Sequence, residues 1–338
     1  MAWYHLPGPD HDVAVSCQVS FARNLSGIPF TSQMDANTAR QLIDQVGNLL
    51  CQGGFTAIDF QNISPTSAYA WVEQRYASTA FAKSCLPHVL YINQPCHLSV
   101  MVCELDHIRL QCIQPGLSLG VAYEGVSKIE QMLDGQLSFA FNENLGYLSS
   151  HPAHVGSGMQ ASVMLFLPML CQSGELSAME SGIERLGMVL RGEKRGAPHT
   201  AKSLYQISTR PMQGVDEETR IGTLERMTLQ LVQRERELRA SVKGKAYDLL
   251  CDKIYRSLGT LTHAHLLSTA ETLSLLGYVR LGVAMGICHS TDIPTLTTLG
   301  IETMPATLST SRQTSPDSQH ERQLWRATFV KEKLKSQA

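Results

Sequence analysis

The sequence is short of charge, and above all of positive charge in its first half. Charged residues make up 17% of the 338 residues, against about 25% in an average soluble protein. The 28 basic and 30 acidic side chains nearly cancel, so no overall positive field indicates nucleic-acid binding. Residues 1–150 contain six basic and twelve acidic side chains, whereas residues 151–338 contain 22 and 18. An enzyme that handles anions would need cations in that first half.

Long apolar runs and paired cysteines are also lacking. The longest strongly apolar run, residues 161–171, is interrupted by Pro168 and is much shorter than the ~20 residues of a membrane span. The first residues do not form a basic region followed by an apolar one, as a secretory signal would. The nine cysteines are scattered and contain no C-x-x-C pair. We therefore expect a cytoplasmic protein with reduced, buried thiols and no membrane partner.

Hydrophobic periodicity predicts short strands mixed with helices, which is typical of an α+β fold. Alternating or apolar segments predict strands at residues 12–21, 57–61, 88–92, 98–103 and 107–113. Helical spacing predicts helices at 35–50, with Asp35 as the N-cap, and at 125–139, 263–286 and 321–335. A long amphipathic helix is expected from residue 217 to about 256, with a break near Gly244.

Three segments are expected to be solvated or loosely ordered. The charged run at residues 234–237 is predicted to be a solvated helix face. Residues 289–320 are rich in Ser, Thr and Pro, which is typical of a loosely ordered connection. The basic last helix is expected to be a solvated face, with a binding patch as the alternative.

Four segments resemble signatures of the ATP:guanido phosphotransferases. Residues 16–25 resemble S-S-R-I-R-L-A-R-N, and residues 103–112 resemble N-E-E-D-H-[IL]-R. Residues 146–164 resemble G-Y-L-T-S-C-P-T-N-V-G-T-G-L-R-A-S-V-M. Arg191-Gly192, followed by residues 205–208, resembles R-G-x-x-G-E … Q-I-S. In the last third, residues 252–257, 279–282 and 321–327 resemble the bacterial protein-arginine kinases, and the chain is identified as a member of that family.

The resemblance implies a fold and a reaction. The fold is an antiparallel sheet flanked by helices, with the nucleotide lying on the sheet, followed by a C-terminal helical domain. The expected units are an N-terminal arm at 1–12, an ATP:guanido phosphotransferase-like domain at 13–240 and a helical domain at 241–338 resembling the phosphoarginine-sensing domain. The reaction transfers the γ-phosphoryl of Mg-ATP to arginine in a protein, and the marked proteins go to a Clp-type protease.

The family's nucleotide positions are only partly kept. Family members use about five arginines around the phosphates, because charge spreads over the phosphoryl oxygens in the transition state. Ser16, Ser162, Arg109 and Arg191 are retained. Three phosphate-arginine positions are neutral, and the histidine position near the adenine is changed, so the altered positions are Gln18, Ser20, Gln160 and Arg75. We therefore expect weak Mg-ATP binding.

The family's catalytic positions are not kept. A guanidinium has a pKa above about 12 and needs carboxylates to align it and take its proton. The first catalytic glutamate is replaced by Leu105, and the second falls on Gly196 in an ungapped alignment. The reactive cysteine position is His151. No catalytic residue of the family is intact at its own position.

The phosphoarginine-sensing signature is weakened in the same way. The family motif R-D-x-x-R-A falls on Arg322, Gln323, Arg326 and Ala327. Gln323 replaces the aspartate, and an amide cannot neutralise a guanidinium. We expect weak phosphoarginine binding there.

These losses predict a pseudoenzyme with the family's fold and partner surfaces. Its implied partners are the family activator protein, a Clp-type chaperone or protease, or an intact kinase, and it could form homo-oligomers. The alternative is an active protein-arginine kinase with a rewired site that uses Glu104, Asp106 or Glu193. A third possibility is another ligand in the old nucleotide cleft. His151 and His154 could suggest a metal pair, but no third ligand is in view and no metal is expected.

Overall fold

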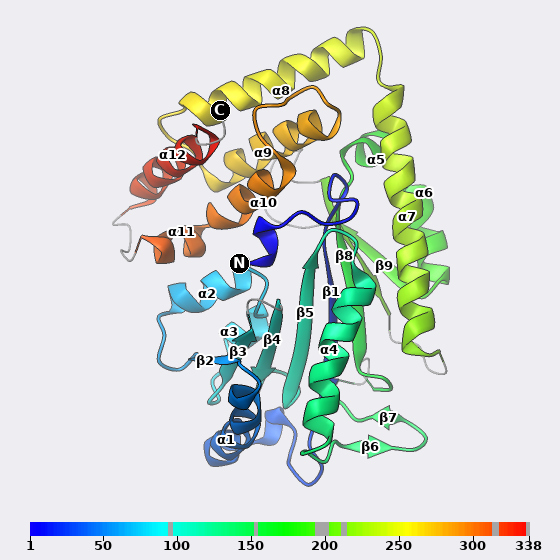
Figure 1. Ribbon diagram of the computed structural model, residues 1–338, viewed down its shortest axis with the longest axis vertical. Helices are drawn as coiled ribbons and strands as arrows, with labels where there is room; N and C mark the ends of the chain where they lie inside the picture. Colours follow the sequence, from blue (N-terminus) through cyan, green and yellow to red (C-terminus); the bar gives the residue numbers. More distant parts are fainter. Residues whose placement is uncertain (94–96, 152–154, 193–202, 211–214, 313–317, 336–338) are drawn as a thin grey trace.

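The centre of the molecule is an eight-stranded sheet that is antiparallel throughout (Figure 1). The computed structural model describes residues 1–93, 97–151, 155–192, 203–210, 215–312 and 318–335. The strand order is β2 (Thr56–Asp59), β3 (Val89–Asn93), β4 (Leu98–Val102), β5 (Ile108–Pro115), β1 (Ala14–Arg23), β8 (Met159–Phe166), β10 (Leu204–Thr209) and β9 (Met188–Gly192). A hairpin of β6 (Phe141–Asn142) and β7 (Gly146–Tyr147) lies beside the sheet. The predicted α+β fold is confirmed.

One face of the sheet carries the main hydrophobic core. Successive side chains of a strand point to opposite faces, so Cys17, Val19 and Phe21 of β1 all enter this core. The helices that cover this face are α1 (Ala36–Gln52), α4 (Leu119–Asp134) and α7 (Glu217–Ser241), with the shorter α5 (Pro168–Ser173) and α6 (Glu175–Arg185) at the β9 side. The intervening polar residues of β1 therefore face the other way.

On the opposite face, helices from the last third of the chain lie against one end of β8 and β10, and two short helices cover the side of β3 to β5. There α2 (Pro65–Glu73) and α3 (Thr79–Ala82) pack over β3, β4 and β5. The second core cluster includes Tyr76, Phe81, Leu90, Met101 and Ile113. The centre of this face, on β1 and β8, is polar and carries the residues singled out by the sequence.

The last third of the chain forms a helical domain with its own core. Gly244, with φ of 57°, separates α7 from α8 (Lys245–His263), as the sequence predicted. Four more helices follow, namely α9 (Thr269–Ala284), α10 (Ile293–Glu302), α11 (Pro305–Ser311) and α12 (Gln319–Lys335). Their buried residues form the third core cluster, which includes Ile254, Leu261, Val279, Leu299 and Val330.

The N-terminal arm lies between the sheet and the helical domain (Figure 1). It begins with a 3-10 turn, η1 (Trp3–His5). The Trp3 indole is buried, and its Nε1 donates to the carbonyl of Gln74, 3.0 Å away. The Thr298 hydroxyl of α10 donates to the Tyr4 carbonyl at 3.1 Å. The arm is therefore held by both larger units.

Asp35 caps α1 as predicted, whereas the helix predicted at 125–139 has different limits. The Asp35 carboxylate accepts from the Thr38 N–H at 2.8 Å. α4 begins at Leu119 instead of residue 125 and ends at Asp134. Its glycines lower helix propensity and hide the first turns from a sequence reading. Gly125 is needed for packing, because a Cβ there would lie 3.1 Å from Cys112 Sγ.

The prediction of a loose connection at 289–320 is wrong for most of that segment. α10 and α11 occupy residues 293–302 and 305–311, and residues 313–317 lie outside the described part of the chain. The Asp292 carboxylate accepts from the Thr295 N–H at 2.8 Å and so caps α10. Leu296 and Leu299 of that helix are buried. Tertiary burial therefore outweighs the Ser/Thr-rich composition.

The prediction of a fully solvated charged run at 234–237 is wrong for Glu235. This side chain is completely buried, and its carboxylate accepts from Arg239 Nε at 2.8 Å and from the Leu170 N–H at 2.9 Å. Arg234 and Glu237 do lie at the surface, where they pair with each other.

No helix in the described residues is both long and apolar enough to cross a membrane. None of the eight cysteines in the described residues is joined to another of them by a disulfide. Cys51 and Cys85 are exposed, so the prediction of buried thiols is wrong for these two.

Candidate functional site

The sheet register brings most of the predicted nucleotide residues onto one face. Ser16, Gln18 and Ser20 alternate along β1 and so point the same way. Ser162 lies opposite Gln18 and Gln160 lies opposite Ser20 on the neighbouring β8. Directly paired residues of antiparallel strands share a face. By the same rule Arg109, opposite Ala22 on β5, and Arg191, opposite Gln206 on β9, face the same side.

The centre of this face is a chain of hydrogen bonds that joins two glutamines, Arg75 and Ser16, and Arg75 brings a positive charge to it. Gln18 Nε2 donates to Gln111 Oε1 at 2.8 Å, and Gln111 Nε2 donates to the Arg75 carbonyl at 2.7 Å. Arg75 Nη1 then donates to Ser16 Oγ at 2.9 Å. Gln111 is buried and was not singled out from the sequence, although its i+2 spacing from Arg109 places it on this face. The polar groups here satisfy one another.

Arg109 is already compensated by neighbouring side chains. Its Nη2 donates to Gln160 Oε1 at 3.2 Å, and its Nη1 lies 3.6 Å from Glu104 Oε1. The Glu104 side chain is only 3% exposed and accepts from Ser78 Oγ at 2.6 Å. This geometry makes Glu104 a partner of Arg109 and Ser78, and leaves Arg109 with less net charge for a ligand.

Leu105 occupies an exposed bend between β4 and β5. Its side chain is 47% exposed, whereas its carbonyl accepts from the Thr31 hydroxyl and from Ser150 Oγ at 2.8 Å. The backbone is therefore fixed while the side chain faces solvent. A leucine at this place supplies neither a proton acceptor nor a negative charge.

Asp106, next to Leu105, is a buried structural acceptor. Its carboxylate accepts from Asn24 Nδ2 at 2.7 Å, from the Ser150 N–H at 2.8 Å and from Ser149 Oγ at 3.0 Å. These contacts join β1, the β4–β5 bend and the loop after β7. The i, i+2 pair of Glu104 and Asp106 lies in a bend rather than in a strand, so the two carboxylates do not share a strand face.

Two of the remaining motif positions, Arg191 and His151, lie in the described part of the chain, and both are exposed. Arg191 is exposed near the end of the edge strand β9. His151 is exposed, and its N–H donates to Ser149 Oγ at 3.2 Å. Gly196, Glu193 and His154 lie outside the described residues.

The four residues of the sensing motif lie on α12 in different environments. Arg326 is buried, and it donates from Nε to the Thr303 carbonyl at 2.8 Å and from Nη1 to the Leu267 carbonyl at 2.9 Å. Burial lowers the pKa of Arg326 to about 10. Ala327 is in the helical core.

Arg322 and Gln323 lie nearer the surface. Arg322 borders a groove of about 390 Å³ shared with Glu73, Tyr69 and Pro305. Gln323 accepts from the Leu267 N–H at 3.2 Å through its backbone carbonyl. Of the motif's two arginines, Arg322 borders a cavity, whereas Arg326 donates its hydrogen bonds to backbone carbonyls.

The residues on the sheet face do not fit a magnesium triphosphate well. Gln18, Ser20 and Gln160 add no positive charge, and Arg109 shares its charge with Glu104. A triphosphate needs several cationic donors, because its oxygens carry the charge of the transferring group. Within the described ranges, no three His, Cys, Asp or Glu side chains are grouped closely enough to hold a metal ion. The arrangement is an internally hydrogen-bonded surface on which Arg75 and Arg109 are already bonded to neighbouring side chains.

Comparison with known proteins agrees with the fold. A family model described as ATP:guanido phosphotransferase, C-terminal catalytic domain, matches residues 37–238. A second, described as Protein-arginine kinase McsB C-terminal domain, matches residues 247–338. Among solved structures, the substrate-free duplicated taurocyamine kinase from Schistosoma mansoni superposes with a TM-score of 0.62 at 20% identity, covering 79% of this chain and 40% of that one. A lombricine kinase gives 0.58 at 19% identity and covers 69% of each chain.

Similarity to curated proteins extends over nearly the whole chain. The protein-arginine kinase of Clostridium novyi (strain NT) is 33% identical over 343 residues, which cover 98% of each chain. That of Bacillus pumilus (strain SAFR-032) is 31% identical over 339 residues, covering 98% of this chain and 93% of that one. With both family models matching in order along one chain, this protein belongs to the protein-arginine kinase family of ATP:guanido phosphotransferases.

Proposed function

We propose that this chain is a catalytically impaired member of its family that acts as a regulatory or scaffold partner. Its setting would be arginine phosphorylation and Clp-type protein quality control in the cytoplasm. The observation that carries the proposal is the hydrogen bond between the neutral side chains of Gln18 and Gln111, because the family resemblance puts a phosphate-binding arginine at the position of Gln18. Leu105 at a catalytic glutamate position adds to it.

The proposal follows from what the reaction requires. Removing one acid–base group costs about 10²–10⁴ in rate, and removing an arginine that stabilises a transferring phosphoryl costs about 10³ or more. The losses need not multiply, because groups that act as a unit are non-additive. Even one of them would leave a very slow enzyme. The retained fold and helical domain would still offer surfaces to a partner.

A phosphoarginine assay tests the catalytic half of the proposal. The purified chain is incubated with Mg-ATP and an arginine-rich protein, and acid-labile phosphoarginine is measured against the Bacillus pumilus relative as positive control. We expect no signal above that of Leu105→Arg, which puts a positive charge at the catalytic position. A clear signal above this control would favour the rewired kinase, and its loss in Glu104→Gln would then identify the base.

Nucleotide binding is tested separately by thermal unfolding. A ligand that binds only the native state raises its stability by RT ln(1 + L/Kd), where L is the free ligand concentration. We expect Mg-ATP to leave the melting temperature unchanged, whereas a variant with arginine at positions 18, 20 and 160 should gain a nucleotide-dependent shift. A shift of equal size in the unchanged chain would contradict the expected weak binding of Mg-ATP.

The proposal that the chain acts through protein partners is tested by mixing it with each of them. The proposed partners are the family activator, a Clp-type chaperone or protease, and an intact kinase, with homo-oligomers as a further form. Light scattering of the chain alone and mixed with an intact relative reports complex formation, and the phosphoarginine output of that relative reports regulation. Unchanged mass and unchanged output with every partner would contradict a regulatory role.

A further inference from the structure

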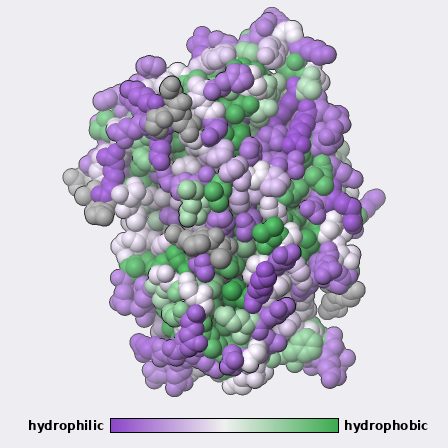
Figure 2. Space-filling view, viewed as in Figure 1, coloured by the Kyte–Doolittle hydropathy of each residue, from purple (hydrophilic) through white to green (hydrophobic). Residues whose placement is uncertain are grey.

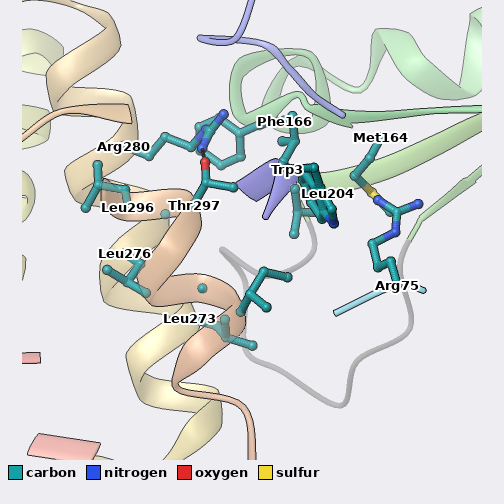
Figure 3. Close-up of a pocket in the computed structure, with 14 residues that line it drawn as sticks. Trp3, Arg75, Met164, Phe166, Leu204, Leu273, Leu276, Arg280, Leu296 and Thr297 are labelled. Atoms are coloured by element: carbon teal, nitrogen blue, oxygen red, sulfur yellow. Dashed lines mark hydrogen bonds between the residues drawn. The ribbon is translucent and has the colours of Figure 1, made fainter. Parts of the chain in front are cut away.

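An apolar cavity lies between the polar sheet face and the helical domain. Its volume is about 120 Å³. Met164 and Phe166 of β8 and Leu204 of β10 form the sheet side, and the other side is formed by α9, α10 and the arm (Figure 3). The lining from that other side includes Trp3, Leu273, Leu276, Arg280, Leu296, Thr297 and Ile301. Three parts of the molecule therefore meet at one cavity.

The charged side chains of this lining are both arginines. Arg75 and Arg280 lie on opposite sides of the cavity (Figure 3), and the described lining contains no acidic residue. The Arg75 guanidinium is bound to Ser16 Oγ. Arg280 is the more deeply buried of the two, and a buried guanidinium gains from contact with a carboxylate.

Arg280 is buried without an ion-pair partner among the described residues. It is 7% exposed, its Nη1 donates to Thr297 Oγ1 at 2.9 Å, and its Nη2 donates to the His11 carbonyl. Its Nε is buried with no hydrogen-bond partner. The nearby carboxylate of Asp12 is already paired with Arg236 and Arg239. Burial lowers the pKa of Arg280 to about 10, so the group is still a cation at neutral pH.

Arg280 is a buried cation with no anionic partner among the described residues. The apolar cavity beside it has room for an anion only as part of a ligand. Burying an unpaired charge or an unsatisfied donor is unfavourable, and a charge-assisted hydrogen bond to a carboxylate relieves both. We propose that the cavity binds a small monocarboxylate with an apolar ring or branched chain, whose carboxylate pairs with Arg280 and whose apolar part lies among Leu276, Leu204 and Phe166.

The size of the cavity limits the ligand. An engineered cavity of about 150 Å³ holds one benzene ring, and the space here is about 120 Å³, so the apolar part of the ligand is limited to a single ring or a short branched chain at most. A nucleotide is the rival occupant, because the family resemblance places the adenine near Arg75. A nucleotide is several times larger and presents phosphate groups rather than one carboxylate. The proposal holds whether or not the chain transfers phosphate.

Benzoate and its neutral isostere benzamide test the proposal on the unmodified full chain. Trp3 lines the cavity, so its fluorescence reports occupancy, and Trp3→Phe identifies its share among the three tryptophans. We expect benzoate to quench this signal with a Kd of about 1 mM or tighter, in keeping with a ligand of few atoms. The affinity for benzamide should be lower than that for benzoate by about 10-fold or more, because benzamide cannot form the charge-assisted hydrogen bond. 4-Methylpentanoate should behave as benzoate does.

Two variants examine the same contact. Arg280→Met should lower benzoate affinity about 10-fold or more while benzamide affinity changes little, and Leu276→Trp should block both ligands by filling the cavity. Arg256→Met is the matched control, since the Arg256 side chain is exposed on the surface of α8 and pairs with Asp252. If Arg280→Met fails to fold, the benzoate–benzamide comparison on the unmodified chain still decides. Equal binding of the two probes, no carboxylate binding, or quenching by ATP alone would each overturn the proposal.

Discussion

Arg23 illustrates how this chain uses guanidinium groups inside its fold. The side chain is 1% exposed, and its Nη2 lies 2.6 Å from Glu130 Oε1. Its guanidinium carbon lies 3.6 Å from the centre of the Tyr147 ring, and its Nη1 donates to the Ser157 carbonyl. Arg326 is buried and bound to carbonyls in a comparable way. Such arginines hold segments together, so a count of arginines overstates the charge that a ligand can use.

Asp106 gives the residue-scale prediction. Replacing it with asparagine leaves one acceptor oxygen where the carboxylate now receives hydrogen bonds from Asn24, Ser149 and Ser150. Hydrogen bonds to a buried charged group are worth about 1.5–3 kcal/mol each. We expect Asp106→Asn to lower the free energy of unfolding by about 3 kcal/mol in denaturant titrations.

Asp134→Asn is the control for Asp106→Asn. Asp134 is exposed at the end of α4, so its amide variant should unfold as the parent chain does. If Asp106→Asn were as stable as this control, the carboxylate would be available for chemistry, as the rewired-kinase alternative requires.

At this scale the sequence predicts which residues share the site and misses how they bond. Strand alternation and the family motifs place Gln18, Ser20 and Gln160 together, and the sheet register agrees. The bond from Gln18 to Gln111 spans 93 positions of sequence and depends on strand pairing that periodicity does not specify. The same holds for Arg75 and Ser16, because Arg75 reaches the face from a turn with φ of 68°.

At the scale of elements, α7 shows why a charge run is an unreliable sign of solvent exposure. Its residues 234–237 alternate in sign, yet Glu235 faces inward between Arg239 and the first turn of α5. The Met169 and Leu170 N–H groups both donate to the Glu235 carboxylate. A helix start needs acceptors for its first N–H groups, and here a distant helix supplies them. This contact depends on tertiary packing, so the local sequence of α7 does not predict it.

Glu235→Gln tests this buried contact. The amide keeps the shape but loses the charge, so Arg239 loses a buried partner and one N–H of α5 loses its acceptor. Removing one partner of a buried ion pair costs about 3–5 kcal/mol. Because Arg239 also contacts Asp12 at 3.2 Å, we expect a loss of stability at the lower end, about 3 kcal/mol. Chemical denaturation followed by far-UV circular dichroism measures it.

The matched control lies two residues along the same helix. Glu237 is exposed and pairs with Arg234, so Glu237→Gln should leave the unfolding midpoint unchanged. If both variants were equally stable, the Glu235 contact would be a surface contact in solution, as the charge pattern alone suggests.

α10 and α11 show a second limit of sequence reading. Their Ser and Thr residues lower helix propensity, but here the hydroxyls bond back to carbonyls four residues earlier, as Thr297 does to Ile293 and Ser309 to Pro305. The first turn of α11 receives its acceptor from Glu73 of α2, which binds the Thr307 N–H at 2.7 Å. A partner 234 residues away cannot be found from local composition.

The whole molecule is held together along the seam between sheet and helical domain. The hydropathy surface in Figure 2 is mostly polar, with hydrophobic residues scattered between charged ones, and the large apolar clusters lie inside. Ile301 of α10 belongs to the same cluster as Trp3 and Phe81 of the first two thirds. The sequence predicts the two units and their order, whereas the arm's place between them follows from buried contacts of Trp3 and Tyr4.

Three histidines in separate places make the stability of the molecule depend on pH. Burial lowers the pKa of His5, at the arm, of His88, beside Phe60 and Phe81, and of His107, at the β4–β5 bend. A lowered pKa means that the native state binds the proton less tightly than the unfolded chain does. Stability is therefore fully present above the unfolded value of about 6.5 and is lost as the pH falls below it.

His107 is the histidine whose contribution can be isolated most clearly. Its Nδ1 accepts from the Leu25 N–H at 3.0 Å and its Nε2 lies 2.8 Å from the Pro29 carbonyl, an arrangement that needs the neutral ring. We expect the free energy of unfolding to fall between pH 7.5 and 5.5, and His107→Asn to be less stable but to fall less steeply. Glu217, Glu235 and Glu302, whose pKa burial raises, contribute with the opposite sign in both proteins and cancel in the comparison. His151→Asn, at an exposed position, should keep the parent slope. A parent chain whose stability is flat over this range, or a His107→Asn variant with the parent slope, would show that the buried ring does not set the pH response.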